Sequence, residues 1–279
     1  DPVTRNIDLD KVEAAITPRT KAIIVVDLFG GVYDVDALRA IEKRYNLRII
    51  EDAAQAPGAL YKGENAGTLS DIGVYSLNFH KHIHTGEGGV AVTDDDRLAE
   101  RLQLIRNHAE AVVEAKGVAA DFKLIGQNYR MTELHAAIGR EQLKKLDILI
   151  KKRQDHCRYI AERCQDMPGV RPAPIRPDTT HVFYVHPFLY DEKIVGVPRN
   201  KFVEAIEAEI PTGLSRGYVK PIYRMPFIGQ APGLCPVVER LHGSELINHE
   251  LMHAQMTAKD LDDVIEAFHK VYRLRGDLA

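Results

Sequence analysis

The first hundred residues alternate short apolar runs with amphipathic segments, and this alternation limits the folds open to the chain more than any other feature. The runs at 21–26 and 47–51 are rich in Ile and Val and too short for helices. We predict strands at 21–26, 47–51, 71–77 and 89–93 and helices at 9–16, 34–45 and 94–107. Strands that alternate with helices indicate an α/β domain with a mainly parallel sheet.

The second half of the chain has a different pattern. Long helical stretches at 132–146 and 147–165 precede a proline-rich break at 168–179. We then predict a strand at 181–189 and helices at 199–209 and 259–273. The predicted domains are therefore a large domain at 1–140 and a smaller C-terminal α/β domain at 141–279.

Composition excludes several classes of protein. The formal net charge of the 279 residues is -3, which argues against a nucleic-acid partner. No apolar run is long enough to span a membrane. Three cysteines without metal-type spacing are read as reduced thiols in a cytoplasmic protein. The chain begins at Asp1 and reaches its first predicted helix, with Asp8 as the N-cap, within a few residues. We therefore expect the sequence to start inside a domain.

Three polar residues follow the predicted strands at the same end. Asp52 comes directly after the strand 47–51, Ser76 lies at the end of the strand 71–77, and Lys81 follows on the same side. In a parallel sheet, ligands collect outside the carboxyl ends of the strands. Gly86 and Gly88 let the backbone approach a bulky cofactor closely, or simply form a tight turn. An Asp and a Lys so placed are what pyridoxal phosphate requires: a partner for its ring nitrogen and a Schiff-base amine.

A carboxylate at Asp52 is strong enough for this task. An opposite charge at about 4 Å contributes roughly 4 kcal/mol at an effective dielectric constant of about 20, which raises a pKa by about 3 units. Taken alone, however, Asp52 also fits a helix N-cap, and Lys81 alone also fits a solvated loop. Only the combination favours a cofactor site.

The chain resembles the DegT/DnrJ/EryC1/StrS family of sugar aminotransferases, which have the aspartate-aminotransferase fold (fold type I). The resemblance spans nearly the whole chain. The matching segments are Asp8–Thr20, Glu51–Ala56, Ser76–Lys81, Thr85–Gly89, Asn128–Glu133, Ala136–Gly139, Gln142-Leu143 and Gly217–Tyr223.

The resemblance implies a role for each matching residue. Lys81 would be the Schiff-base lysine and proton shuttle, and Asp52 would pair with the pyridine nitrogen. Ala54 would pack on the ring face, and Gln55 would donate to the phenolic oxygen. The phosphate would be bound by Ser76 and, across the interface of a homodimer with shared active sites, by Asn128.

The chain departs from the family pattern in three places. The family carries an N-terminal segment before the position of Asp1, with a phosphate loop and a ring-stacking aromatic residue. Tyr184 stands where the family often has His, with His186 two residues later. A proline that is usual near 246–249 is absent. We therefore expect an N-terminally truncated chain with altered substrate contacts.

Two further groups of residues allow more than one interpretation. The alternating His80, His82 and His84 could be imagined as a zinc site, but no carboxylate or cysteine is suitably near to complete it, and we predict no metal. Tyr218 and Lys220, with the nearby Tyr223, would contact a sugar hydroxyl or phosphate, or would pack around Pro221.

These observations predict an aminotransferase that moves the amino group of glutamate or glutamine to a keto sugar, nucleotide-linked, or to a keto-cyclitol. Two half-reactions imply ping-pong kinetics. One alternative is a sugar dehydratase on the same fold. Some dehydratases of the family carry His in place of the lysine, and the presence of Lys81 disfavours that alternative. The other alternative is a non-catalytic truncated homologue.

Overall fold

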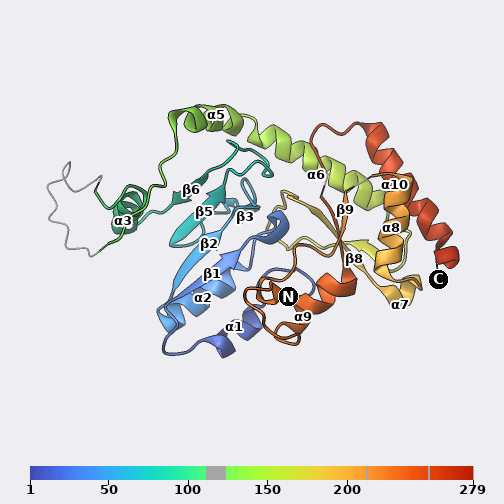
Figure 1. The fold of residues 1–279 in the computed structure, drawn as a ribbon, viewed down its shortest axis with the longest axis horizontal. Coiled ribbons are helices and arrows are strands. Elements are labelled where there is room, and N and C mark those ends of the chain that lie inside the picture. The colour runs from blue at the N-terminus through green and yellow to red at the C-terminus, as the bar shows by residue number, and fades with distance from the viewer. Residues whose placement is uncertain (111–123, 212, 251, 279) are drawn as a thin grey trace. The chain divides into compact units, whose positions relative to one another are not determined.

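The computed structural model describes residues 1–110, 124–211, 213–250 and 252–278. They form two compact units, each with its own sheet (Figure 1). The N-terminal unit consists of Asn6–Asp147 and Asp178–Thr180, and the C-terminal unit consists of Asp1–Arg5, Ile148–Pro177 and His181–Ala279. The two predicted domains, 1–140 and 141–279, stay a prediction.

The N-terminal unit is built on a four-stranded sheet with the order β1-β2-β5-β6. Its strands are β1 (Ala22–Val26), β2 (Arg48–Asp52), β5 (Ile72–Ser76) and β6 (Gly89–Val92). The first three are parallel and β6 is antiparallel to β5, so the prediction of a mainly parallel sheet is confirmed. Asp52 pairs with Val26 on one side and Val74 on the other. The carboxyl ends of the three parallel strands therefore meet at one edge.

Local capping explains where several helices of this unit begin. The helices are α1 (Leu9–Ala15), α2 (Val35–Tyr45), α3 (Asp96–Arg106) and α5 (Glu133–Leu143), with a 3-10 turn η1 (Leu28–Gly30) after β1 and a hairpin of β3 (Leu60–Tyr61) and β4 (Glu64–Asn65) after β2. The side chains of Asp34, Asp95 and Thr132 each accept a hydrogen bond from a first-turn N–H. Asp8 occupies the cap position of α1 without such a bond, and its carboxylate pairs instead with Lys11 at 2.9 Å.

The C-terminal unit contains an antiparallel sheet with the order β7-β8-β10-β9. Its strands are β7 (Val170–Pro172), β8 (His186–Tyr190), β9 (Leu214–Arg216) and β10 (Leu246–His249). Its helices are α6 (Leu146–Arg163, which begins in the N-terminal unit), α7 (Glu192–Val195), α8 (Arg199–Glu209), α9 (Pro236–Arg240) and α10 (Ala258–Arg273), with the helical turns η2 (Ile222–Arg224), η3 (Leu241–Glu245) and η4 (Arg275–Leu278).

Aromatic side chains form the centre of this unit. Phe268 on α10 lies 5.5 Å from Phe188 on β8 and 6.3 Å from Phe202 on α8, measured between ring centroids. All three rings are fully buried. Helix α10 begins with a reciprocal capping box between Thr257 and Asp260. The ring contacts join α10 to strand β8 of the sheet and to α8.

The predicted strand at 181–189 begins later than the sequence indicates, because a buried arginine hydrogen-bonds to the backbone carbonyl groups of its first part. Arg153 Nη1 donates to the carbonyl oxygens of Phe183 (2.9 Å) and Tyr184 (3.0 Å), and Phe183 has a positive φ of 51°. The pairing of β8 with β10 therefore starts only at His186. The short strands β7, β9 and β10 were not predicted. Strand β7 lies in the proline-rich segment, where Pro172 is tolerated on an edge strand.

None of the helices in the described ranges is both long and apolar enough to cross a membrane.

A buried histidine predicts acid sensitivity of the C-terminal unit. Burial lowers the pKa of His186 well below its usual value, and the nearby His249 and His181 lower it further. In the unfolded chain this imidazole binds a proton near pH 6.5, whereas in the folded chain it binds one only at a much lower pH. The free energy of unfolding should therefore fall as the pH drops below about 6.5, by up to about 1.4 kcal/mol per pH unit for one histidine.

Denaturant unfolding at about pH 7.5 and about pH 5.5 checks this expectation. His186→Gln should show a smaller loss of stability between the two pH values than the unmodified protein. The exposed His108 offers the matched control, because His108→Gln should leave the loss unchanged. Equal losses in the unmodified protein and in His186→Gln would contradict the assignment.

Candidate active site

The strands β1, β2 and β5 (Figure 1) end at one edge of the sheet, which carries several of the predicted site residues of the N-terminal unit. Asp52 is the last residue of β2 and Ser76 the last residue of β5. Asp27 directly follows β1, and its backbone N–H donates to the carbonyl oxygen of Asp52 at 3.0 Å. Residues from three neighbouring strands therefore lie on one edge, where α/β sheets bind ligands.

Asp52 is held by its own turn. Its Oδ1 accepts a hydrogen bond from the N–H of Ala54 at 3.0 Å, and the N–H of Ala53 donates to the carbonyl oxygen of Val74 at 2.9 Å. No helix starts in the described residues that directly follow Asp52. The alternative of a helix N-cap is therefore wrong, and the carboxylate remains partly exposed at the sheet edge.

Lys81 lies on a compact loop that begins at the end of β5. Ser76 Oγ accepts from the N–H of Asn78 at 3.2 Å, and the carbonyl oxygen of Asn78 accepts from the N–H of Lys81 at 2.9 Å. Asn78 also donates from Nδ2 to Glu87 at 2.9 Å. Asn78 thus connects both ends of the loop and fixes the path of the backbone from Ser76 to Lys81.

The far side of the same loop requires a glycine. Gly88 has a φ of +156°, and a Cβ there would lie 2.9 Å from Thr85 Oγ1 and 3.3 Å from Met131 Cε. The N–H of Leu77 donates to the carbonyl oxygen of Gly88 at 2.9 Å, and the N–H of Thr85 donates to that of Leu77 at 3.0 Å. The close approach of these segments holds the lysine loop against the start of β6.

Burial and one neighbouring charge act on Lys81 in opposite directions. The side chain is half-buried, and burial lowers the pKa of its ammonium, while the negative charge of Asp52 raises it. Burial has the larger effect, so the pKa of Lys81 lies below its usual value. A lowered pKa increases the fraction of neutral amine, the form that attacks a carbonyl.

Gln55 is oriented by the backbone of a neighbouring loop. Its Oε1 accepts from the N–H of Phe29 at 2.7 Å, and Phe29 is 2% exposed with a positive φ of 63°. Because a backbone N–H can only donate, the oxygen of the amide must face Phe29. The amide nitrogen of Gln55, with its two N–H donors, is therefore directed away from the N–H of Phe29.

Asn128 lies in an exposed strand-like segment next to α3. It forms a β-bridge with Asn107, and its Oδ1 accepts from the N–H of Arg130 at 3.5 Å. Arg130 also hydrogen-bonds to Asn107. The adjoining Tyr129 is 68% exposed. The segment is therefore fixed by its backbone while its side chains face outward.

Tyr218 and Lys220 belong to the C-terminal unit. Tyr218 hydrogen-bonds to Tyr184, whose hydroxyl has a pKa raised by burial despite that bond. Lys220 is exposed. Gly217, just before them, has a φ of +86°, and a Cβ there would lie 2.6 Å from the carbonyl oxygen of His242. The tight turn at Gly217 positions Tyr218 beside Tyr184.

Two buried acids at the sheet edge were missed by the sequence reasoning. Asp27 and Glu51 are both fully buried. Glu51 accepts from the N–H groups of Gly67 (2.7 Å) and Leu69 (3.0 Å), and Asp27 accepts from the N–H of Tyr33 (3.2 Å). Burial raises the pKa of Asp27 well above its usual value, and the Glu51 charge raises it further. The sequence signal that could have identified them is an acidic residue at the end of each of the two apolar runs, 21–26 and 47–51.

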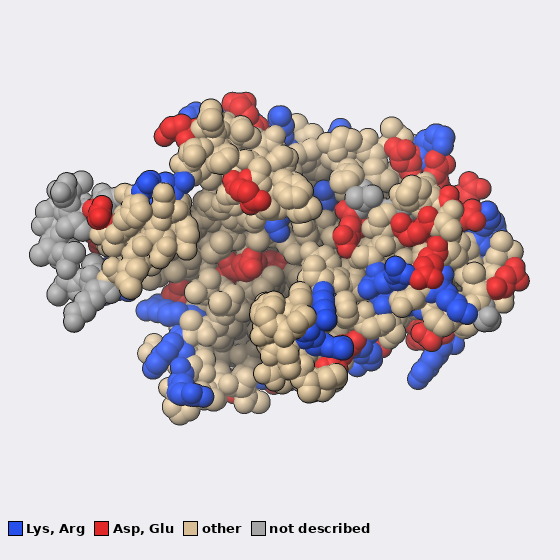
Figure 2. Space-filling view, viewed as in Figure 1, with Lys and Arg blue, Asp and Glu red and all other residues tan. Residues whose placement is uncertain are grey.

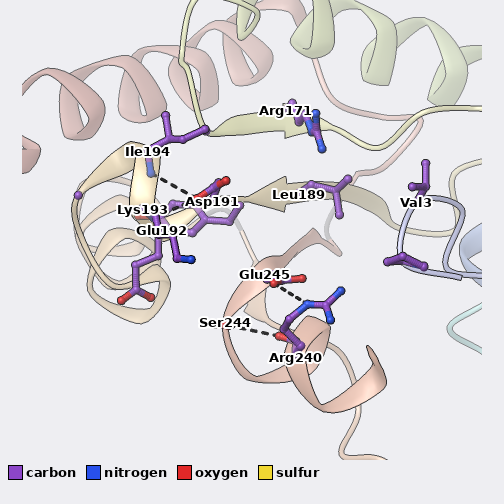
Figure 3. Close-up of a pocket in the computed structure, with 14 residues that line it drawn as sticks. Val3, Arg171, Leu189, Asp191, Glu192, Lys193, Ile194, Arg240, Ser244 and Glu245 are labelled. Atoms are coloured by element: carbon purple, nitrogen blue, oxygen red, sulfur yellow. Dashed lines mark hydrogen bonds and ion pairs between the residues drawn. The ribbon is translucent and has the colours of Figure 1, made fainter. Parts of the chain in front are cut away.

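A separate cavity of about 860 Å³ lies in the C-terminal unit. Arg171, Asp191 and Lys193 line it, together with the ion pair between Arg240 and Glu245 (Figure 3). None of the predicted site residues lines this cavity. Among the residues the structure describes, no group of three or more His, Cys, Asp or Glu side chains is arranged to hold a metal ion.

Comparisons with known proteins identify the family of this chain. The sequence profile of the DegT/DnrJ/EryC1/StrS aminotransferase family matches residues 1–269. The L-glutamine:2-deoxy-scyllo-inosose aminotransferase of Streptoalloteichus tenebrarius is 33% identical over 305 residues, covering 100% of this chain and 71% of that protein. The GDP-perosamine synthase of Caulobacter vibrioides is 33% identical over 277 residues, covering 97% and 71%.

A solved structure gives the same result for the fold. The aminotransferase from Psychrobacter cryohalolentis superimposes with a TM-score of 0.88 at 26% identity, over 98% of this chain and 74% of that one. The predicted fold type I of pyridoxal phosphate-dependent transferases is thereby confirmed. The chain belongs to the DegT/DnrJ/EryC1/StrS aminotransferase family and is a pyridoxal phosphate-dependent transaminase.

Proposed function

We propose that this chain holds pyridoxal phosphate at the edge formed by β1, β2 and β5 and uses it to aminate a keto sugar or keto-cyclitol. One arrangement carries the proposal: Asp52 and Ser76 end two neighbouring parallel strands, and Lys81, whose ammonium is influenced by the Asp52 charge, lies on the loop that follows Ser76. A desolvated lysine near a carboxylate at the end of parallel strands supplies both the amine and the counter-charge that this cofactor requires.

The side chains at the sheet edge fit the polar ends of the cofactor. Asp52 offers a negative charge to the ring nitrogen. Gln55, with Oε1 held by the N–H of Phe29, has its N–H donors on the end that a phenolic oxygen would require. Ser76 Oγ already accepts from a backbone N–H, so its hydroxyl proton suits a phosphate oxygen. Ala54 is small enough to lie against a ring face.

Lys81 Nζ has two tasks in this proposal. As a neutral amine it binds the cofactor covalently, and the lowered pKa favours that form. With the amino-acid donor in the site, Nζ would accept the proton from the donor's α-carbon and would later return a proton, as a general base and acid. When bound, pyridoxal phosphate supplies the electron sink that makes this proton acidic.

The proposed donor is glutamate or glutamine, and the proposed acceptor is a nucleotide-linked keto sugar or a keto-cyclitol. The relatives support both acceptor classes, since one is named for an inosose and glutamine and another for a GDP-linked sugar. We assign Tyr218 and Lys220 to the acceptor. The hydrogen bond between Tyr184 and Tyr218 would orient a hydroxyl toward a sugar, and the exposed ammonium of Lys220 suits a phosphate.

We also propose a homodimer in which Asn128 reaches the phosphate bound by the partner subunit. Next to Asn128, the side chains of Tyr129, Leu134 and Ile138 are 68%, 78% and 47% exposed. Leu134 and Ile138 are four residues apart and share one face of α5. Exposed apolar side chains gathered in this way are typical of an interaction surface.

A cytoplasmic location stays a prediction, supported by the three free cysteines. Nucleic acid remains an unexpected partner, because the formal net charge is -3. Acidic and basic side chains are interspersed on the face shown in Figure 2. Such a mixed surface does not attract a polyanion.

Replacing the lysine tests the covalent assignment. Lys81→Ala should lower transamination by roughly 10²–10⁴-fold, the usual worth of a positioned acid–base group. In the unmodified protein, borohydride reduction with pyridoxal phosphate should attach the cofactor to the peptide that contains Lys81, as read by mass spectrometry.

The matched control is Lys62→Ala, because Lys62 is exposed and its ammonium pairs with Asp36 at the surface. It should keep both activity and labelling. Attachment at another lysine, or unchanged turnover in Lys81→Ala, would refute the role of Lys81. Product formed without any amino donor would point instead to a dehydratase.

Replacing the carboxylate tests the ring-nitrogen partner separately. Asp52→Asn should keep the covalent attachment but lower kcat/KM by up to about 10³-fold, because the lost charge corresponds to about 4 kcal/mol at an effective dielectric constant of about 20. Asp94→Asn, at an exposed position, is the control and should leave kcat/KM unchanged. An Asp52→Asn protein with normal kcat/KM would show that Asp52 does not act on the cofactor.

A further inference from the structure

The orientation of Gln55 depends on a turn that this side chain does not itself build. Gln55 Oε1 accepts from the N–H of Phe29 at 2.7 Å. Phe29 is the central residue of η1 and has a φ of +63°, a conformation that residues with a Cβ adopt only when neighbouring contacts hold them. The amide of Gln55 is therefore only as well oriented as this turn.

Asn6 holds both ends of the turn. Its Oδ1 accepts from the N–H of Leu28 at 3.0 Å, and its Nδ2 donates to the carbonyl oxygen of Gly31 at 2.9 Å. Phe29 lies between these two anchor points. The Asn6 side chain is 6% exposed, so water does not compete strongly for either bond. The carbonyl oxygen and the amide nitrogen of one side chain thus brace the backbone on either side of Phe29.

Two further hydrogen bonds of the turn are local. The N–H of Gly30 donates to the carbonyl oxygen of Asp27 at 3.3 Å, and the N–H of Gly31 donates to that of Leu28 at 3.2 Å. These are local bonds that many turns form. The two bonds from Asn6, which is 22 residues from Leu28 and 25 from Gly31 in the sequence, tie this turn to a distant segment on either side of the bond between Phe29 and Gln55.

We propose that Asn6 is a positioning residue for Gln55: through the turn at Leu28–Gly31 it fixes the amide so that its N–H donors face the phenolic oxygen of pyridoxal phosphate. The inference rests on the proposed function, since it needs the cofactor at this edge. Asn6 itself does not touch the cofactor. Its effect is carried by the N–H of Phe29 and by the amide of Gln55.

The pH titration of the bound cofactor's visible absorption separates positioning from a merely structural role. The proton shared between Lys81 Nζ and the phenolic oxygen has a pKa that this absorption reports. A donor on the phenolic oxygen stabilises the negative charge left when the proton departs, so losing the donor raises this pKa. Gln55→Ala should raise it by about one unit, the size of a lost hydrogen bond to a charged oxygen.

Asn6→Ala should raise the same pKa in the same direction as Gln55→Ala. In the double variant Asn6→Ala/Gln55→Ala the shift should equal that of Gln55→Ala alone, because Asn6 has nothing left to position. Asn65→Ala is the matched control, since Asn65 is exposed in the same unit, and it should leave the titration unchanged. Asn6→Ser adds no charge but is too short to hold both Leu28 and Gly31, so it should also raise this pKa. If Asn6→Ala does not fold, Asn6→Ser decides.

The outcomes distinguish this inference from the proposed function. If the unmodified protein binds no cofactor at Lys81, the proposed function fails. If it binds and Gln55→Ala shifts the titration while the Asn6 variants do not, the inference alone fails. Additive shifts in the double variant would also overturn it, because Asn6 would then act independently of Gln55.

Discussion

The parallel register of three strands is the constraint on which the site depends. Asp52 pairs with Val26 on β1 and Val74 on β5, and its carbonyl oxygen accepts from the N–H of Asp27 just beyond β1. These backbone bonds bring the ends of β1, β2 and β5 to one level. Each loop that leaves this edge therefore starts from a fixed point, including the loop that carries Lys81.

Buried acids stabilise the edge without adding to its negative charge in full. Glu51 uses its carboxylate to hold the N–H groups of Gly67 and Leu69. Burial and the Glu51 and Asp52 charges raise the pKa of Asp27 well above its usual value. Of these three carboxyl groups, Asp52 is the one that is partly exposed, and it is therefore the one that can face a cofactor.

Much of this arrangement could be predicted from the sequence, because it follows from short-range patterns. Apolar runs located the strands, and the rule that parallel strands end at one edge brought Asp52 and Ser76 together. Other features depend on contacts between distant segments and leave no periodic signal. Neither the bonds from Asn6 to the turn around Phe29 nor the late start of β8, caused by Arg153, can be read from spacing.

The central claim is that the edge formed by β1, β2 and β5 holds the cofactor with its ring nitrogen on Asp52. A crystal structure of the protein grown with pyridoxal phosphate tests this most directly. The account predicts continuous density from Lys81 Nζ to the cofactor and a ring nitrogen about 2.7–2.9 Å from an Asp52 carboxylate oxygen. A cofactor bound elsewhere, or a ring nitrogen facing away from Asp52, would contradict it.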